Sequence, residues 1–67
     1  MSEPNLIGER IKSLRGEKTQ RTVADDLGIS VSALGMYETG KRVPRDEVKV
    51  RMAEYFNTTV EAIFFAA

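Results

Sequence analysis

The chain has 67 residues, no cysteine and no histidine, and its ten Lys and Arg residues are balanced by ten Asp and Glu residues. This composition excludes a disulfide framework, a zinc site with cysteine or histidine ligands, and catalysis by a histidine base or a cysteine nucleophile. The length fits a single domain, residues 1–67, with a small core. We expect no cofactor and no bound metal.

The N-terminal third predicts one helix and no targeting or membrane segment. Residues 1–4 carry no basic start followed by an apolar run, and no apolar run approaches the ~20 residues of a membrane span. We therefore expect a cytoplasmic protein, with residues 1–4 flexible. A first helix is predicted over residues 5–17, capped by Asn5. Its buried face should hold Leu6, Ile7, Ile11 and Leu14.

Residues 19–39 predict two short helices joined by a tight turn. Thr19 can cap the first helix, residues 20–27, whose apolar face is formed by Val23, Ala24 and Leu27. Gly28 follows directly, at a position where glycine adopts positive φ without steric cost. Ser30 can cap the second helix, residues 31–38. About three residues separate the two helices, as in a helix-turn-helix motif.

The remainder predicts two more helices, and the charge is unevenly distributed along it. A fourth helix is expected over residues 45–56, after Pro44. A short fifth helix is expected after a cap at Thr58, in a capping box with Glu61, or after a cap at Thr59 instead. With no strand pattern, the fold class is all-α: a compact bundle of five short helices. Residues 41–51 hold five basic and two acidic side chains. Such a segment is expected to meet phosphates, although a solvated charged loop is the alternative.

Two runs of residues carry a resemblance to a known family. They are Thr-Gln-x-x-Val-Ala-x-x-Leu-Gly-Ile-Ser from Thr19, and Ser-x-Leu-x-x-Tyr-Glu-x-Gly-Lys-Arg-x-Pro from Ser32. In register they resemble the Cro and phage-repressor (XRE, Cro/C1-type) class, over residues 6–64. The chain departs from the class in a linker that is about two residues shorter before Thr19. The resemblance implies a lambda-repressor-like domain that binds double-stranded DNA, regulates transcription, and is not an enzyme.

In this class the second helix of the motif lies in the major groove of DNA, with its N-terminal part facing the base edges. The residues expected to contact bases are Val31, Ser32, Gly35 and Met36, with Leu34 buried beneath them. Val31 replaces the hydrogen-bonding residue of many relatives, and it can pack on a thymine methyl group. We expect few bidentate base contacts and a large share of recognition through DNA shape. The alternative is that Val31 and Met36 belong to the core.

The resemblance also implies contacts with the DNA backbone and one structural ion pair. The expected phosphate contacts are Thr19, Gln20, Arg21, Ser30, Thr39, Lys41, Arg42 and Arg45. For the basic residues among them, a solvated surface role is the alternative. In the family a glutamate at the position of Glu38 pairs with an arginine of the first helix, here Arg15. Such a pair would fix the second helix of the motif against the first helix of the chain.

The C-terminal segment is unusually apolar for a chain end, and it predicts an interface. The residues expected there are Val60, Phe64 and Phe65, of which Phe65 is the one not needed in the core. The resemblance implies a homodimer that binds an inverted-repeat operator as a repressor. A monomer with an exposed tail is the alternative.

A different class of function stays open: a protein-interaction module, such as an antitoxin, that holds a protein partner. Catalysis is the least favoured reading, because Asp25 and Asp26 are adjacent on a helix and diverge by about 100°.

Overall fold

The computed structural model describes residues 2–67, and this part of the chain contains five helices and no strand. The helices are α1 (Pro4–Arg15), α2 (Gln20–Leu27), α3 (Val31–Glu38), α4 (Asp46–Tyr55) and the short η1 (Glu61–Phe65). The predicted all-α bundle of five short helices is confirmed. None of the helices formed by residues 2–67 has the length and apolar character needed to cross a bilayer.

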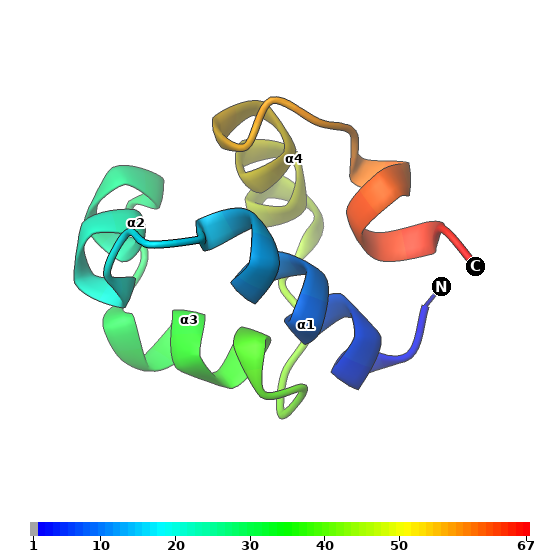
Figure 1. The fold of residues 1–67 in the computed structure, drawn as a ribbon, viewed down its shortest axis with the longest axis horizontal. Helices are drawn as coiled ribbons and strands as arrows, with labels where there is room; N and C mark the ends of the chain where they lie inside the picture. The colour runs from blue at the N-terminus through cyan, green and yellow to red at the C-terminus, as the bar shows by residue number, and fades with distance from the viewer. Residues whose placement is uncertain (1) are drawn as a thin grey trace.

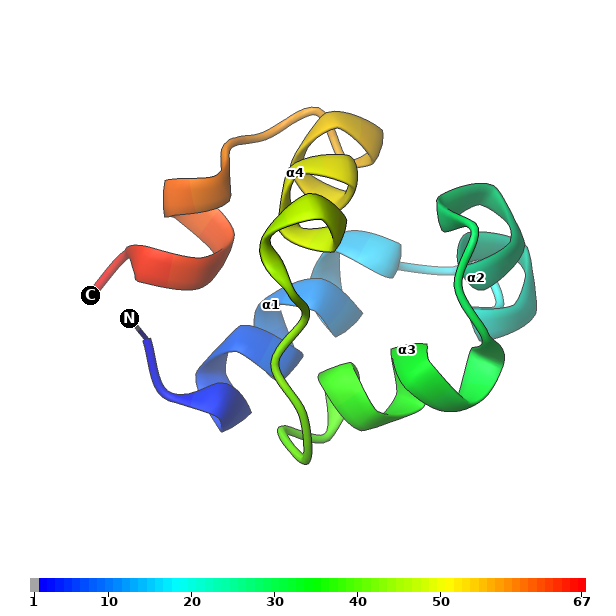
Figure 2. The ribbon, with the colours of Figure 1, turned by 180° about the vertical axis from the view of Figure 1, so that it is seen from behind.

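α1 runs through the middle of the molecule, and the other helices are arranged around it (Figure 1). α3 lies along one side of α1, α2 lies at one end, and α4 lies on the side away from α3. η1 lies at the end opposite α2, beside the two chain termini. The reverse view in Figure 2 shows the same arrangement. α3 therefore occupies an outer edge of the bundle.

The core is formed by apolar side chains from all five helices. Ile11, Val23, Ala24, Leu34, Met52 and Phe64 are fully buried. Leu6 and Leu14, which were predicted to share the buried face of α1, are exposed. This prediction was wrong because the face of α1 that contacts α3 is lined by a glycine rather than by leucine.

That glycine is Gly8, which brings the backbones of α1 and α3 into direct contact. A Cβ atom built on Gly8 would overlap the carbonyl oxygen of Glu38 and lie 2.8 Å from the carbonyl oxygen of Tyr37. Both neighbours are backbone atoms and cannot move away as a flexible side chain could. The position of the last turn of α3 is therefore set by the absence of a side chain at residue 8.

The start of the chain is held against its end. Ser2 donates from its amide to the carbonyl of Phe64 (2.8 Å) and from its hydroxyl to the carbonyl of Ala66 (2.6 Å). Arg10 donates to the carbonyls of Ile63 and Ala66, each at 2.8 Å. The flexible start that was predicted for residues 1–4 is therefore not seen from Ser2 onward. Met1 lies outside the described residues.

Helix ends agree with the sequence at some positions and differ at others. α1 begins at Pro4, Glu3 is at the N-cap position, and no side chain caps the helix. The prediction that Asn5 caps this helix was therefore wrong. Proline suits a first helical turn because its missing N–H has no partner there in any case. Of the two caps predicted for the last helix, Thr58 and Thr59, it is Thr59 that forms one, since its hydroxyl accepts from the amide of Ala62 at 3.0 Å.

Candidate nucleic-acid interface

The turn between α2 and α3 has the local structure that its residues predict. The hydroxyl of Thr19 accepts from the amide of Thr22 at 3.1 Å, and that of Ser30 accepts from the amide of Ala33 at 3.0 Å. Gly28 ends α2 in the left-handed conformation, with φ of 72°. Two capped helices joined through a left-handed glycine place α3 across the end of α2.

The outward side of α3 carries the four residues that were predicted to contact bases. Val31 is 37% exposed, Ser32 is also exposed, and Gly35 and Met36 are half-buried. Leu34 lies beneath them and is fully buried. Neither Val31 nor Met36 is part of the core cluster. This surface has no charged side chain, because the one charged residue of α3, Glu38, points into the protein.

Glu38 connects three helices. Its Oε2 accepts from Nε of Arg15 at 2.7 Å, and its Oε1 accepts from Nη2 of Arg15 at 3.1 Å and from Nε2 of Gln20 at 3.0 Å. The carboxylate side chain is 3% exposed and that of Arg15 is 16% exposed. The hydrogen bonds that Arg15 donates to Glu38 raise the pKa of the Arg15 guanidinium above its ordinary value. The bidentate pair fixes the angle of α3 against α1.

This network changes the part that Gln20 can play. Because its amide donates to Glu38, its side chain is turned toward the protein instead of outward. What Gln20 offers a phosphate is its backbone N–H at the start of α2, where the helix dipole favours an anion. Its side chain orients α2 relative to the end of α3.

The other residues that were predicted to contact phosphates are all exposed: Thr19, Arg21, Ser30, Thr39, Lys41, Arg42 and Arg45. Thr39 donates its hydroxyl to the carbonyl of Gly35 at 2.9 Å, so it must rotate to donate to a phosphate. Nη1 of Arg45 lies 3.8 Å from the carboxylate of Glu47. Because both side chains are exposed, this ion pair is weak and leaves the guanidinium of Arg45 able to contact a phosphate.

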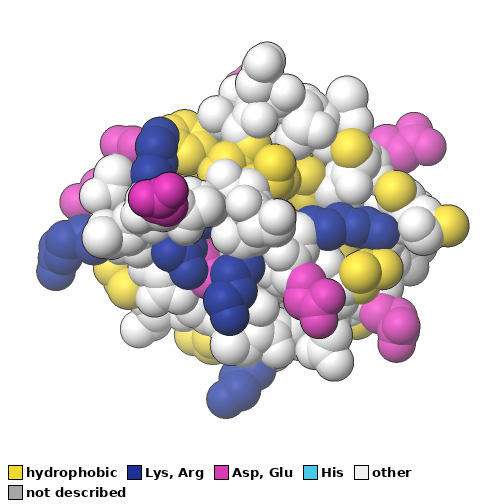
Figure 3. All heavy atoms as spheres, in the orientation of Figure 1, with side chains coloured by type: hydrophobic (Ala, Val, Ile, Leu, Met, Phe, Trp, Pro, Cys, Tyr) yellow, Lys and Arg dark blue, Asp and Glu magenta, His cyan; other side chains and the backbone are white. Residues whose placement is uncertain are grey.

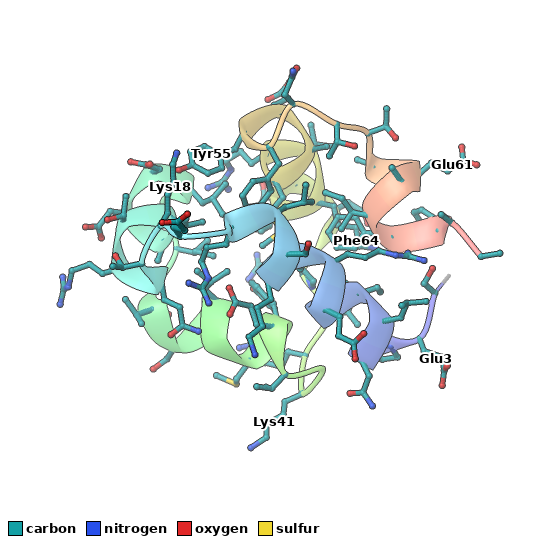
Figure 4. The ribbon with its side chains drawn as sticks, viewed as in Figure 1. Glu3, Lys18, Lys41, Tyr55, Glu61 and Phe64 are labelled. Atoms are coloured by element: carbon teal, nitrogen blue, oxygen red, sulfur yellow. The ribbon has the colours of Figure 1, made fainter. Side chains whose placement is uncertain are left out.

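Residues 39–45, which follow α3 and are called the basic loop below, fold back on the end of that helix. The amides of Lys41 and Arg42 donate to the carbonyl of Met36 at 2.9 and 3.3 Å. The side chain of Lys41 extends outward at the outer edge of the molecule, below α3 (Figure 4). Lys18 lies at a different edge, next to Tyr55 in the same view. The loop therefore places Lys41 at the outer edge of the molecule next to α3.

Phe64 is not available to an interface. It was predicted as a dimer-interface residue, but its side chain is fully buried in the core, so this prediction was wrong. Val60 is half-buried and packs against the core cluster. Phe65 is 49% exposed, and the ammonium of Lys49 lies 5.4 Å from its ring centroid. Of the three residues, Phe65 offers the most surface to a partner.

Several contacts around the motif have no clear signal in the sequence. Arg51 of α4 donates to the carbonyl of Leu27 at 2.6 Å and so completes the end of α2. The hydroxyl of Tyr55 donates to Asp26 at 2.6 Å and accepts from Lys18 at 3.1 Å. This hydrogen bond with Tyr55 raises the pKa of Lys18. Both contacts attach α2 to α4. Neither an arginine at position 51 nor a tyrosine at position 55 indicates such a contact from the sequence alone.

Comparison with protein families matches the chain to the helix-turn-helix family HTH_3, of the XRE and Cro/C1 type, over residues 11–63. Neither the curated proteins nor the solved structures yielded a match. The matched segment includes the capped α2 and α3, the Glu38 network and the basic loop. Members of this family bind DNA, and their domain is not catalytic. The chain therefore belongs to the XRE and Cro/C1-type helix-turn-helix family of DNA-binding proteins.

Proposed function

We propose that this protein, acting as one domain over residues 1–67, is a transcriptional repressor that binds an inverted-repeat operator in the cytoplasm as a homodimer. In this arrangement α3 enters the major groove and a bound dimer blocks access to a promoter. The observation that supports the proposal best is the outward side of α3. It carries no charged side chain, and Val31 and Ser32 on it are exposed. Three exposed cations follow it in the chain, Lys41, Arg42 and Arg45, and the hydrogen bonds of Glu38 attach α3 to α1 and α2.

The contacts divide into two groups with different roles. Val31, Ser32, Gly35 and Met36 would meet base edges and carry sequence preference. The phosphate contacts would position the helix through the exposed residues around it, with Gln20 acting through its backbone amide. Phosphate contacts supply affinity that falls with salt and carry no direct sequence information.

The proposal is tested by selecting duplexes from a random pool with the full chain and measuring how binding depends on salt. We expect an inverted repeat with half-sites about one DNA turn apart, ~34 Å. Lys41→Ala should weaken binding and reduce the slope of log K against log salt by about one. Lys18→Ala is the matched control, because Lys18 lies at another edge of the molecule (Figure 4), and it should leave the slope unchanged. Binding that barely responds to salt would instead favour a protein-interaction module.

The dimer would form through the C-terminal segment. A groove of about 330 Å³ lies between α1 and η1 with the segment before it, and both polar and apolar side chains line it: Arg10, Ser13, Leu14, Thr58, Ala62 and Ile63. Apolar side chains gather on this face above α1 (Figure 3). Together with the exposed ring of Phe65, this surface supports a self-complementary contact between two copies.

Phe65→Ala is expected to shift the sedimentation mass from dimer toward monomer and to weaken operator binding. The ring is half exposed, so its removal should have little effect on thermal unfolding of the monomer. Val50→Ala, at an equally exposed valine of α4, serves as the control for loss of apolar surface. A Phe65→Ala variant that sediments as a dimer would show that the contact lies elsewhere.

A further inference from the structure

The chemistry of the outward side of α3 is unusual for a helix that reads bases. None of the eight residues of α3 is Lys, Arg, Asn, Gln or His, which are the side chains that make bidentate or strongly directional contacts with bases. Its only charged residue, Glu38, is occupied by Arg15 and Gln20. The hydroxyl of Ser32 can make a single hydrogen bond with little discrimination. Apolar contact is what remains.

Val31 and Met36 supply that contact, and Gly35 brings them close to the surface they meet. Among the five glycines, Gly35 is the one with neither a positive φ nor an atom within 4 Å of an added Cβ. The fold therefore does not require glycine there, and glycine inside a helix is less stable than alanine. A glycine on this side of the helix allows close approach of an external surface.

Resting on the DNA-binding function given above, we propose that α3 reads the C5-methyl groups of pyrimidines in the major groove. The ligand group is the methyl of thymine, and equally that of 5-methylcytosine. Val31 is the main determinant, since this residue is more than a third exposed at the start of α3, the part that faces base edges in this motif. Met36 adds adaptable apolar contact.

A methyl reader and a hydrogen-bond reader rank the four pyrimidines differently. Thymine and uracil share the O4 acceptor, and cytosine and 5-methylcytosine share the N4 donor. A helix that reads hydrogen bonds therefore groups thymine with uracil. A helix that reads methyl groups ranks thymine above uracil and 5-methylcytosine above cytosine. Removing one buried methyl group should weaken binding about fourfold.

The experiment uses the duplex selected by the full chain, with one half-site pyrimidine replaced in turn by thymine, uracil, cytosine and 5-methylcytosine, each paired with its complement. Each thymine of the half-site is tested in this way. We expect at least one position where thymine binds about fourfold more tightly than uracil, and 5-methylcytosine more tightly than cytosine. Equal binding of thymine and uracil at every position would overturn the inference while leaving the DNA-binding function in place.

A protein variant assigns the effect to Val31. Val31→Ala should lose most of the preference for the thymine duplex over the uracil duplex, while Val50→Ala, the matched control on α4, should keep the full preference. Both valines are exposed, at 37% and 49%, so both variants should melt close to the parent protein. A preference as strong in Val31→Ala as in the parent protein would overturn the assignment. Failure to select any duplex would overturn the proposed function itself, and this inference with it.

Discussion

Replacing Glu38 by alanine is expected to lower the free energy of unfolding by about 2–3 kcal/mol, a large fraction of the stability of so small a domain. The change removes three hydrogen bonds and leaves the guanidinium of Arg15 and the amide of Gln20 without their shared partner. The expected loss is below that of a fully buried pair because Arg15 keeps some access to water. Urea denaturation followed by circular dichroism measures it.

The same variant separates the structural role of Glu38 from any role in binding. Glu54→Ala, at an exposed glutamate of α4, is the control and should change stability by less than about 0.5 kcal/mol. Glu38→Ala should also lose affinity for DNA at temperatures where it remains folded, since α3 is no longer held at a fixed angle. Equal stability of the two variants would mean that the network contributes nothing to folding.

Gly8→Ala is expected to destabilise the fold by about 3 kcal/mol, the upper end of the usual effect of overpacking. The added Cβ would overlap the backbone of Glu38, so α1 and α3 have to separate along their closest contact. Such a separation also stretches the pair between Arg15 and Glu38. The measurement is again the free energy of unfolding in urea.

Gly35→Ala is the matched control, with the opposite sign expected. The added Cβ meets no atom within 4 Å, so the helix should gain about 0.5–1 kcal/mol from the better propensity of alanine. DNA binding should nevertheless weaken, because the methyl group stands on the outward side of α3. Two glycines on packed helices would thus respond in opposite directions to the same substitution. A destabilised Gly35→Ala variant would contradict this account of the surface.

The local parts of the fold could be predicted from the sequence because short-range chemistry decides them. Thr19, Ser30 and Thr59 are hydroxyl residues followed by helical stretches, and each forms the expected cap. Gly28 ends α2 in the left-handed conformation for the steric reason that predicted it. The pairing of Arg15 with Glu38 came from family resemblance, and the structure places the two side chains together.

The parts that could not be predicted depend on which surfaces meet. Helical periodicity placed Leu6 and Leu14 inside, whereas α1 contacts α3 through Gly8, and both leucines are left exposed. The burial of Phe64 and exposure of Phe65 depend on how η1 turns against the core, which adjacent phenylalanines do not reveal. The contact of Arg51 with the end of α2 joins residues 24 positions apart, and nothing local marks it.

The hydrogen bonds of Ser2 and Arg10 with the last turn tie the two ends of the polypeptide to each other. Shortening either end would therefore loosen both. Removal of Ser2 takes a donor from the carbonyls of Phe64 and Ala66, and removal of Ala66 takes an acceptor from Ser2 and Arg10. A reporter or affinity tag attached at one end would emerge beside the other, next to η1 (Figure 1). A tag or fusion partner at either end is therefore expected to affect the contacts of both ends.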